Sequence, residues 1–243
     1  LKNKDQEIQE IQLNKAEWKK ETLTKLAQKF PMIKSYSAQG IDDPTSVAKI
    51  SIGLDGFHAV IFSGQEETYY IHPYSKDSKT LMVYKKPHLV PDKDDFTCQV
   101  EAFRSKSVAQ ENSIQNVNDG KLRTFRMALA CTGEYAQFHL TNQNIVSTAT
   151  EEEKKAAVLS AMNTTMTRVN GVFERDLAVK MVLVGENDKI IFLDASTDEL
   201  SNSDPGDLIA ESQTVCDTKI GSDNYDIGHT FSTGGGGLAG LGV

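Results

Sequence analysis

The chain closes with YDIGHTFSTGGGGLAGLGV (Tyr225–Val243), in which four consecutive glycines, Gly234–Gly237, precede an apolar segment broken by further glycines. Because glycine loses more conformational freedom on folding than any other residue, such a run indicates unusual backbone dihedral angles or a close approach by another molecule. The segment after the run has the length of a strand but few side chains, which favours an exposed strand edge near the backbone of a ligand. The alternatives are a flexible tail and a phosphate-binding loop, which requires a helix directly after the glycines.

The composition is that of an ordinary globular chain, with 243 residues, 39% of them hydrophobic and 25% charged, which suits one large or two small domains. The formal net charge of −8 argues against binding to nucleic acid or to an anionic membrane surface. No apolar run approaches the ~18 residues that a membrane span needs. The chain begins at Leu1, without a methionine or an apolar signal core, so we expect that a preceding segment has been removed or is not included.

The first part of the chain predicts a helix followed by a small sheet. Residues 2–30 are highly charged with scattered apolar residues, typical of an amphipathic surface helix, and Pro31 limits it. Within the β-rich region 35–100, four short segments favour antiparallel strands, and Asp55–Gly56 is a turn signal between the first two. These segments are residues 48–54, 57–63, 67–74 and 80–86. We expect the histidines there, His58 and His72, to be ordinary sheet residues, because no spacing brings a pair onto one face.

A second domain is expected from residue 121, after a polar linker at 101–120 that is a plausible site of proteolytic cleavage. Residues 122–132 read as a buried strand. Thr150 and the three glutamates after it start a helix, which we expect to end at Asn170–Gly171. Its buried stripe should comprise Ala157, Leu159, Met162 and Met166.

The remaining elements complete an α/β sandwich with helices on a mixed sheet. Strands are expected at residues 177–184 and 189–195, on either side of a GEND turn. A loop at 201–206, a short helix that opens residues 207–221, and the glycine-rich strand follow. The expected fold class of the whole chain is therefore α+β.

Three cysteines, Cys98, Cys131 and Cys216, cannot all pair with one another. The odd count indicates a free thiol, a metal-bound thiolate or a partner outside the chain. No CxxC or closely spaced Cys/His cluster occurs, which argues against a structural zinc finger.

Several stretches resemble the reprolysin-like (adamalysin-type) metzincin zinc peptidases, in a secreted bacterial form with a propeptide. The stretches that match the catalytic domain are FRMALACTGEY (125–135), NTTMTRVNGVFERDLAVKMVLV (163–184) and SDNYDIGHTFSTGGGGLAGLGV (222–243). The stretches that resemble the propeptide region are KFPMIKSYSAQGIDD (29–43), GFHAVIF (56–62) and YYIHPYSKD (69–77).

The resemblance implies a propeptide-like domain at residues 1–100, with its helix at 2–30, then the linker 101–120. Residues 121–243 would form the upper α/β part of a zincin-like catalytic domain. It also implies a secreted zymogen of a zinc endopeptidase that hydrolyses peptide or protein substrates. Calcium binding by the acidic loops near Asp198 and Asp217 is left open.

The family's zinc motif, HExxHxxGxxH, supplies three zinc-binding histidines and a glutamate general base. It does not occur in this chain. We expect it to follow residue 243, in the remaining C-terminal part of the catalytic domain. No catalytic residue is therefore assigned here, and the chain alone should not hydrolyse peptides. The alternative is a non-catalytic protein-binding module with a degenerate peptidase-like domain.

Four residues match the family's cleft-rim strand, with which an extended substrate pairs antiparallel: Gly237, Leu238, Ala239 and Gly240. An exposed strand edge offers N–H and C=O groups to a peptide, and small side chains leave room for it. His229 lies before this strand and outside any metal spacing, so we expect a structural, hydrogen-bonding role rather than a ligand role.

Cys98 stands in the apolar island FTCQV (96–100), on the propeptide side of the linker. In metallopeptidase zymogens a propeptide cysteine can keep the enzyme latent, because its thiolate takes the zinc position that water needs. The alternatives are a buried small hydrophobe or a disulfide to Cys131 or Cys216. These two look structural, paired with each other or with a cysteine beyond residue 243.

Overall fold

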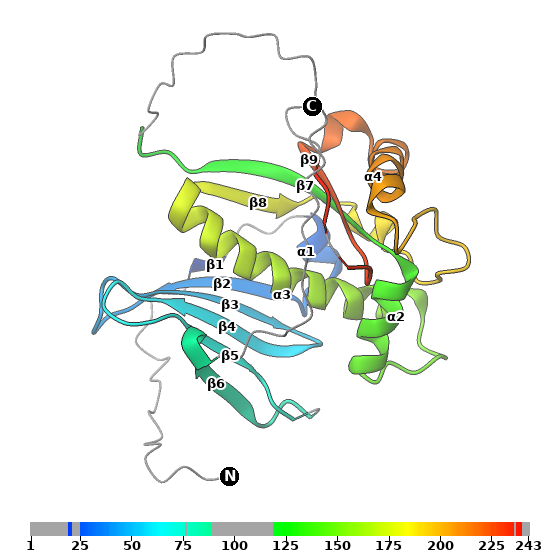
Figure 1. The fold of residues 1–243 in the computed structure, drawn as a ribbon. Coiled ribbons are helices and arrows are strands. Elements are labelled where there is room, and N and C mark those ends of the chain that lie inside the picture. Colours follow the sequence, from blue (N-terminus) through cyan, green and yellow to red (C-terminus); the bar gives the residue numbers. More distant parts are fainter. Residues whose placement is uncertain (1–18, 21–24, 76, 89–118, 236, 240–243) are drawn as a thin grey trace.

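A six-stranded antiparallel sheet and a three-stranded parallel sheet lie on opposite sides of one long helix, α3 (Glu151–Leu177) (Figure 1). This computed structural model describes residues 19–20, 25–75, 77–88, 119–235 and 237–239. The expected α+β fold class is confirmed. None of the helices in these ranges is long and apolar enough to cross a bilayer.

The first sheet follows the order of the chain, and each strand pairs antiparallel with the next. Its last four strands confirm the four expected segments, and the hairpin turn at Asp55–Gly56 is present with Gly56 at a φ of 101°, which favours glycine. The six strands are β1 (Lys19–Lys20), β2 (Lys34–Gln39), β3 (Val47–Gly53), β4 (Gly56–Phe62), β5 (Tyr69–Pro73) and β6 (Leu81–Lys85), and the short 3₁₀ helix η2 (Lys86–His88) follows.

The expected helix over residues 2–30 is wrong in its described part. Residues 19–20 form β1 against β2, and the helix there is the short α1 (Lys25–Lys29); residues 1–18 and 21–24 lie outside the described residues. Lys19 and Lys20 pair with Ser37 and Tyr36 of β2, so the sheet rather than a helix satisfies backbone groups there. Leu26 and Phe30, both about 5% exposed, anchor α1 in the core, and the helix stops before Pro31 as expected.

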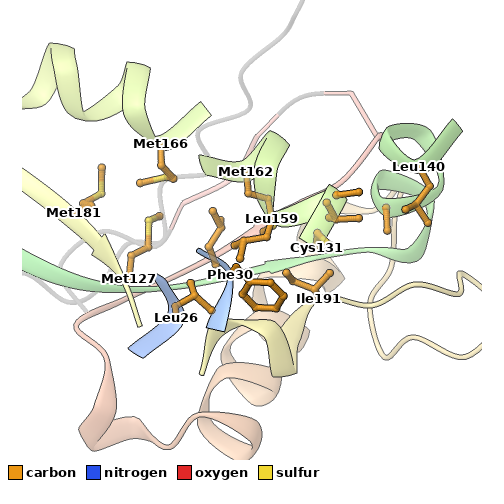
Figure 2. Close-up of a cluster of buried hydrophobic side chains, with 14 residues drawn as sticks. Leu26, Phe30, Met127, Cys131, Leu140, Leu159, Met162, Met166, Met181 and Ile191 are labelled. Carbon is orange, nitrogen blue, oxygen red and sulfur yellow. The ribbon is translucent and has the colours of Figure 1, made fainter. Parts of the chain in front are cut away.

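The second half builds the parallel sheet in the order β8–β7–β9, so the described strands are parallel rather than mixed. Its central strand β7 is buried on both faces, which explains the continuous apolar run Met127–Cys131. Alternate residues of that run pack toward α3 and α1 (Figure 2) or toward α4. The elements are β7 (Arg123–Cys131), α2 (Gly133–Asn142), α3, β8 (Val179–Leu183), η3 (Asn187–Ile190), α4 (Pro205–Lys219), η4 (Ser222–Asn224) and β9 (Ile227–Phe231).

Helix α3 starts as expected but ends later. Thr150 and Glu153 form a reciprocal capping box, and the four residues of the expected buried stripe are all buried. The helix passes through Asn170–Gly171 and ends at Leu177, where Ala178 takes the left-handed conformation (φ 52°).

Tertiary contacts explain why Asn170 and Gly171 lie inside the helix. A Cβ at Gly171 would stand 2.7 Å from the Phe62 ring, so the glycine permits the close approach of β4. The Asn170 amide pairs with the backbone N–H and C=O of Met181 in β8, at 2.8 Å each.

The strand expected at residues 189–195 is also wrong. The GEND segment leads into η3, and only an isolated bridge, Cys131 to Ile191, remains of the strand. The buried Asn187 side chain takes the place of a strand partner, because its amide bonds both the N–H and the C=O of Leu129 at 2.8 Å. The helix expected to be short is α4, of 15 residues, capped by Asp204 with Pro205 in its first turn.

Candidate functional site

The carboxyl ends of β7 and β9 meet at one edge of the parallel sheet, and the glycine-rich segment leaves from this edge. Thr132 N donates to Phe231 O at 3.0 Å. Asn202 then ties both ends together: its Oδ1 accepts from Thr132 Oγ1 and from Thr233 N, each at 2.9 Å. The backbone that enters Gly234–Gly237 is therefore fixed to the sheet.

The expected strand in the glycine-rich tail is not formed by the described residues. Gly237, Leu238 and Ala239 have no regular secondary structure, and Gly240 lies outside the described residues. The strand that sequence reasoning missed is β9, in which Ile227 and Phe231 pack on the core that α3 covers. Ordering a strand costs conformational entropy, which buried side chains offset and glycines do not. The apolar residues of IGHTF are therefore the sequence feature that could have predicted this strand. Whether Gly237–Gly240 binds substrate stays a prediction.

His229 lies exposed on β9, with its ring edge-to-face against Phe231 at a centroid distance of 5.5 Å. The contact that the structure gives this histidine is thus aromatic rather than the expected hydrogen bond.

Cys131 and Cys216 are buried free thiols, so the expected disulfide between them is wrong. They pack on opposite faces of the parallel sheet, Cys131 in the core toward α3 and Cys216 in the core toward α4. Burial raises the pKa of Cys131 to about 12 and that of Cys216 to about 11, which keeps both as inert thiols. Cys98 lies outside the described residues.

The described residues do not fit a zinc site. Across the ranges that the structure covers, no three His, Cys, Asp or Glu side chains gather closely enough to hold a metal ion. The aspartates of the acidic loops are engaged by the chain itself. Asp198 accepts from Gly133 N at 2.6 Å, and Asp217 accepts from the Tyr225 hydroxyl at 2.7 Å.

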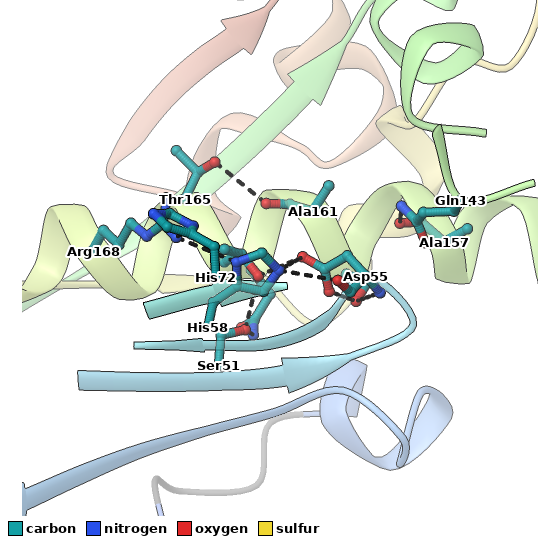
Figure 3. A network of polar contacts seen from close by, with 12 residues as sticks. Ser51, Asp55, His58, His72, Gln143, Ala157, Ala161, Thr165 and Arg168 are labelled. Carbon is teal, nitrogen blue, oxygen red and sulfur yellow. Dashed lines mark hydrogen bonds and ion pairs between the residues drawn. The ribbon is translucent and has the colours of Figure 1, made fainter. Parts of the chain in front are cut away.

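A dense polar network joins the first sheet to α3 (Figure 3). Ser51 Oγ of β3 accepts from Asn163 Nδ2 at 2.9 Å and lies 3.0 Å from Thr164 Oγ1. Asp55, in the β3–β4 turn, accepts from Ser160 Oγ and from Thr164 Oγ1. A Cβ at Gly53 would stand 2.0 Å from Ser160 Oγ, so this glycine is what lets the helix lie on the strand. The face of the sheet that meets α3 is therefore held by hydrogen bonds.

His58 and His72 lie together in this network, so the expectation that no spacing brings a pair onto one face is wrong. The β4–β5 register pairs Ala59 with Ile71, which places the two histidines opposite each other one step along, with ring centroids 5.7 Å apart. The pairing is decided by the register between two strands, which the residue spacing within one strand does not specify.

One guanidinium bridges the two imidazoles. Arg168 Nη2 of α3 lies 2.7 Å from His72 Nδ1 and 3.3 Å from His58 Nδ1. The outer nitrogens have partners as well: His58 Nε2 lies 3.2 Å from Asp55 Oδ2, and His72 Nε2 lies 2.5 Å from the Tyr84 hydroxyl. Because a guanidinium only donates, each Nδ1 must be an unprotonated acceptor.

The electrostatics of the network follow from burial and from Arg168. Burial, then the charges of Arg168 and His58, lower the pKa of His72 to about 4. Burial lowers the pKa of Arg168. Burial opposes ionisation of Asp55, but hydrogen bonds from His58, Ser160 and Thr164 leave its pKa below the ordinary value. A cation already sits between the histidines, which argues against a metal ion there.

The same interface continues at its other end with a buried ion pair. Lys49 of β3 donates to Ser37 Oγ at 2.7 Å and to Glu174 Oε2 of α3 at 2.5 Å. Next to it, between α1, α3 and β8, lies a cavity of about 180 Å³ with mainly apolar walls that include Leu26, Phe30, Leu159, Met166 and Met181.

Comparison with known proteins gives one family. Residues 159–243 match the family described as metallo-peptidase family M12B, reprolysin-like. The match begins within α3 and runs through β8, α4 and β9 into the glycine-rich segment. The resemblance expected from the sequence is thereby confirmed for residues 159–243, and this part of the chain is related to metallopeptidase domains, which are generally zinc-dependent and act on peptides. No curated protein and no solved structure gives a match.

Proposed function

Because residues 159–243 resemble the reprolysin-like metallopeptidases, we propose that the chain is the propeptide and the upper catalytic subdomain of a zinc endopeptidase zymogen. The family match carries this proposal. The parallel sheet supports it, since β7, β8 and β9 bury a common core with α3 and deliver the glycine-rich segment to one edge. In this proposal residues 1–100 act as propeptide, residues 101–120 are the processing linker, and the protein is secreted.

In this proposal the described residues form the scaffold of the domain and supply no zinc ligand. Zinc, when bound, would activate water for attack on a peptide bond. Its ligands are proposed to follow residue 243, because HExxH does not occur in residues 1–243 and the described side chains do not gather into a metal site. Calcium near Asp198 and Asp217 is not proposed, since donors of the chain already occupy both carboxylates.

We propose that Gly237, Leu238, Ala239 and Gly240 form the cleft rim that pairs with extended substrate. The support is their position, directly after a segment that Asn202 fixes to the sheet edge, and their small side chains. A peptide added to such an edge gains main-chain hydrogen bonds.

Cys98 is proposed as the latency ligand that keeps the zymogen inactive. The buried, protonated state of Cys131 and Cys216 supports this choice, since neither thiol is available to a metal ion.

The second candidate is a non-catalytic binding module, which the absence of HExxH from residues 1–243 favours. The test is to purify the complete gene product and residues 1–243 separately. Bound zinc and cleavage of an unfolded protein are then measured with and without a chelator.

We expect the complete product to contain zinc and to cleave, and residues 1–243 to do neither. A complete product without zinc or cleavage would refute the peptidase and favour the binding module. Cleavage by residues 1–243 would refute the placement of the zinc ligands.

A further inference from the structure

The side of α3 that meets the first sheet is mainly polar, apart from Gly171, which the Phe62 ring of β4 approaches closely. Its polar contacts there run from Ser160 through Thr164 and Arg168 to Glu174, and each is a hydrogen bond or an ion pair with β3, β4, β5 or the β3–β4 turn. Polar contacts of this kind can be exchanged for contacts with water when two surfaces separate. The opposite side of α3 packs on the apolar core with β7 and β8.

The histidine pair makes this polar contact sensitive to protons. Arg168 donates to Nδ1 of both rings, and this arrangement exists only while both nitrogens are unprotonated. A proton on either Nδ1 turns an acceptor into a donor that faces the guanidinium, and it places a second positive charge beside the first. Within the described residues, Arg168 Nε is buried without a hydrogen-bond partner.

We propose that the six-stranded sheet is a separable ligand of α3, and that it binds α3 more weakly in mild acid because a proton on the His72 ring breaks its hydrogen bond with Arg168. The inference rests on the proposed function, in which this sheet belongs to a propeptide that must leave the peptidase domain.

The groups that face the pair come from every element packed around it. Asp55, from the β3–β4 turn, lies with Oδ2 at 3.2 Å from His58 Nε2. Among the described residues, no carboxylate pairs with His72: the Tyr70 and Tyr84 rings stack on it, and Arg168 approaches from α3. His72 therefore opposes protonation most strongly, and acid acts chiefly through it.

The direction follows from linkage. The pKa of His72 in the assembled interface is about 4, below the ~6.5 of a free imidazole. The assembled state therefore loses stability as the pH falls from about 6.5 toward 4, and it is fully held above that window. At pH 5 we expect the sheet to bind α3 about tenfold more weakly than at pH 7.5, after allowance for the partial exposure of the ring. Leu26 and Phe30 carry no charge, so their apolar contacts with the core persist in acid.

The test uses the full chain with a specific protease site placed within residues 101–120. After cleavage, the dissociation rate of the two fragments is measured at pH 7.5 and pH 5.0. We expect the two fragments to stay bound at pH 7.5 and to dissociate about tenfold faster at pH 5.0. The His58→Gln/His72→Gln variant should lose this acceleration, whereas His88→Gln, at an exposed residue of η2, should keep it.

Equal wild-type rates at the two pH values, or fragments that separate at once at pH 7.5, would overturn the proposal. So would an acid response that persists in the double variant. If the double variant does not fold, Arg168→Gln replaces it, since removing the guanidinium should reduce the acid response. The dissociation assay requires no zinc and no peptidase activity. It can therefore be interpreted even if the test of peptidase function fails.

Discussion

The Asn187 side chain offers the sharpest test of the structural reasoning, because it replaces a strand. Its amide bonds both the N–H and the C=O of Leu129, at 2.8 Å each, and the site is fully buried. Asn187→Ala would leave two buried backbone groups unpaired, and each unpaired group costs ~1–3 kcal/mol. We therefore expect the free energy of unfolding to fall by about 2–6 kcal/mol, a large share of the ~5–15 kcal/mol that stabilises a typical domain.

The measurement is urea unfolding of the full chain, followed by far-ultraviolet circular dichroism at pH 7. Asn170→Ala should show a loss of similar size, since Asn170 makes the same pair of bonds to Met181. Asn142→Ala, at an exposed position in α2, is the matched control and should stay within ~0.5 kcal/mol of wild type. A loss below ~1 kcal/mol for Asn187→Ala, with the fold retained, would refute the view that this amide serves as a strand partner.

Three further predictions concern the proposed zymogen. Limited proteolysis should cut first in the polar linker, so N-terminal sequencing of the stable fragment should start between Arg104 and Lys121; starts within residues 48–86 would show that the boundary is misplaced. In the complete enzyme, Ala239→Pro should cripple turnover while zinc content stays normal, because proline removes one N–H from the rim; full activity would exclude the rim assignment. Cys98→Ser in the zymogen should raise basal activity, since a hydroxyl binds zinc far more weakly than a thiolate; a variant as silent as its parent would exclude the latency ligand.

Features encoded by neighbouring residues could be predicted from the sequence. The strands from β3 to β6 follow from short β-rich segments with turn residues between them, and the start of α3 follows from Thr150 and Glu153. In both cases the decisive residues lie within one turn or one hairpin of each other. Local pattern rules describe such contacts well.

The errors arose where a distant residue decides the conformation. Asn170–Gly171 has the composition of a helix end, yet Phe62 and Met181 hold it within α3. The pairing of His58 with His72 depends on the β4–β5 register, which no single strand encodes. The apolar residues after Asn187 favour a strand, but the Asn187 side chain already bonds the β7 backbone that such a strand would use.

The two sides of α3 differ in what their separation would cost. Toward the parallel sheet the helix buries Leu159, Met162 and Met166, and each such side chain gives ~1.5–3 kcal/mol that water cannot replace. Toward the first sheet it makes mostly polar contacts, with a net value of ~0.5–1.5 kcal/mol for a neutral hydrogen bond and ~1.5–3 kcal/mol for one to a charged group, because water can substitute for the partner. The main apolar hold of the first half is Leu26 and Phe30 of the α1 region. Helix α3 should therefore stay with the parallel sheet if the first sheet leaves, in accord with a family match that begins at residue 159, inside this helix.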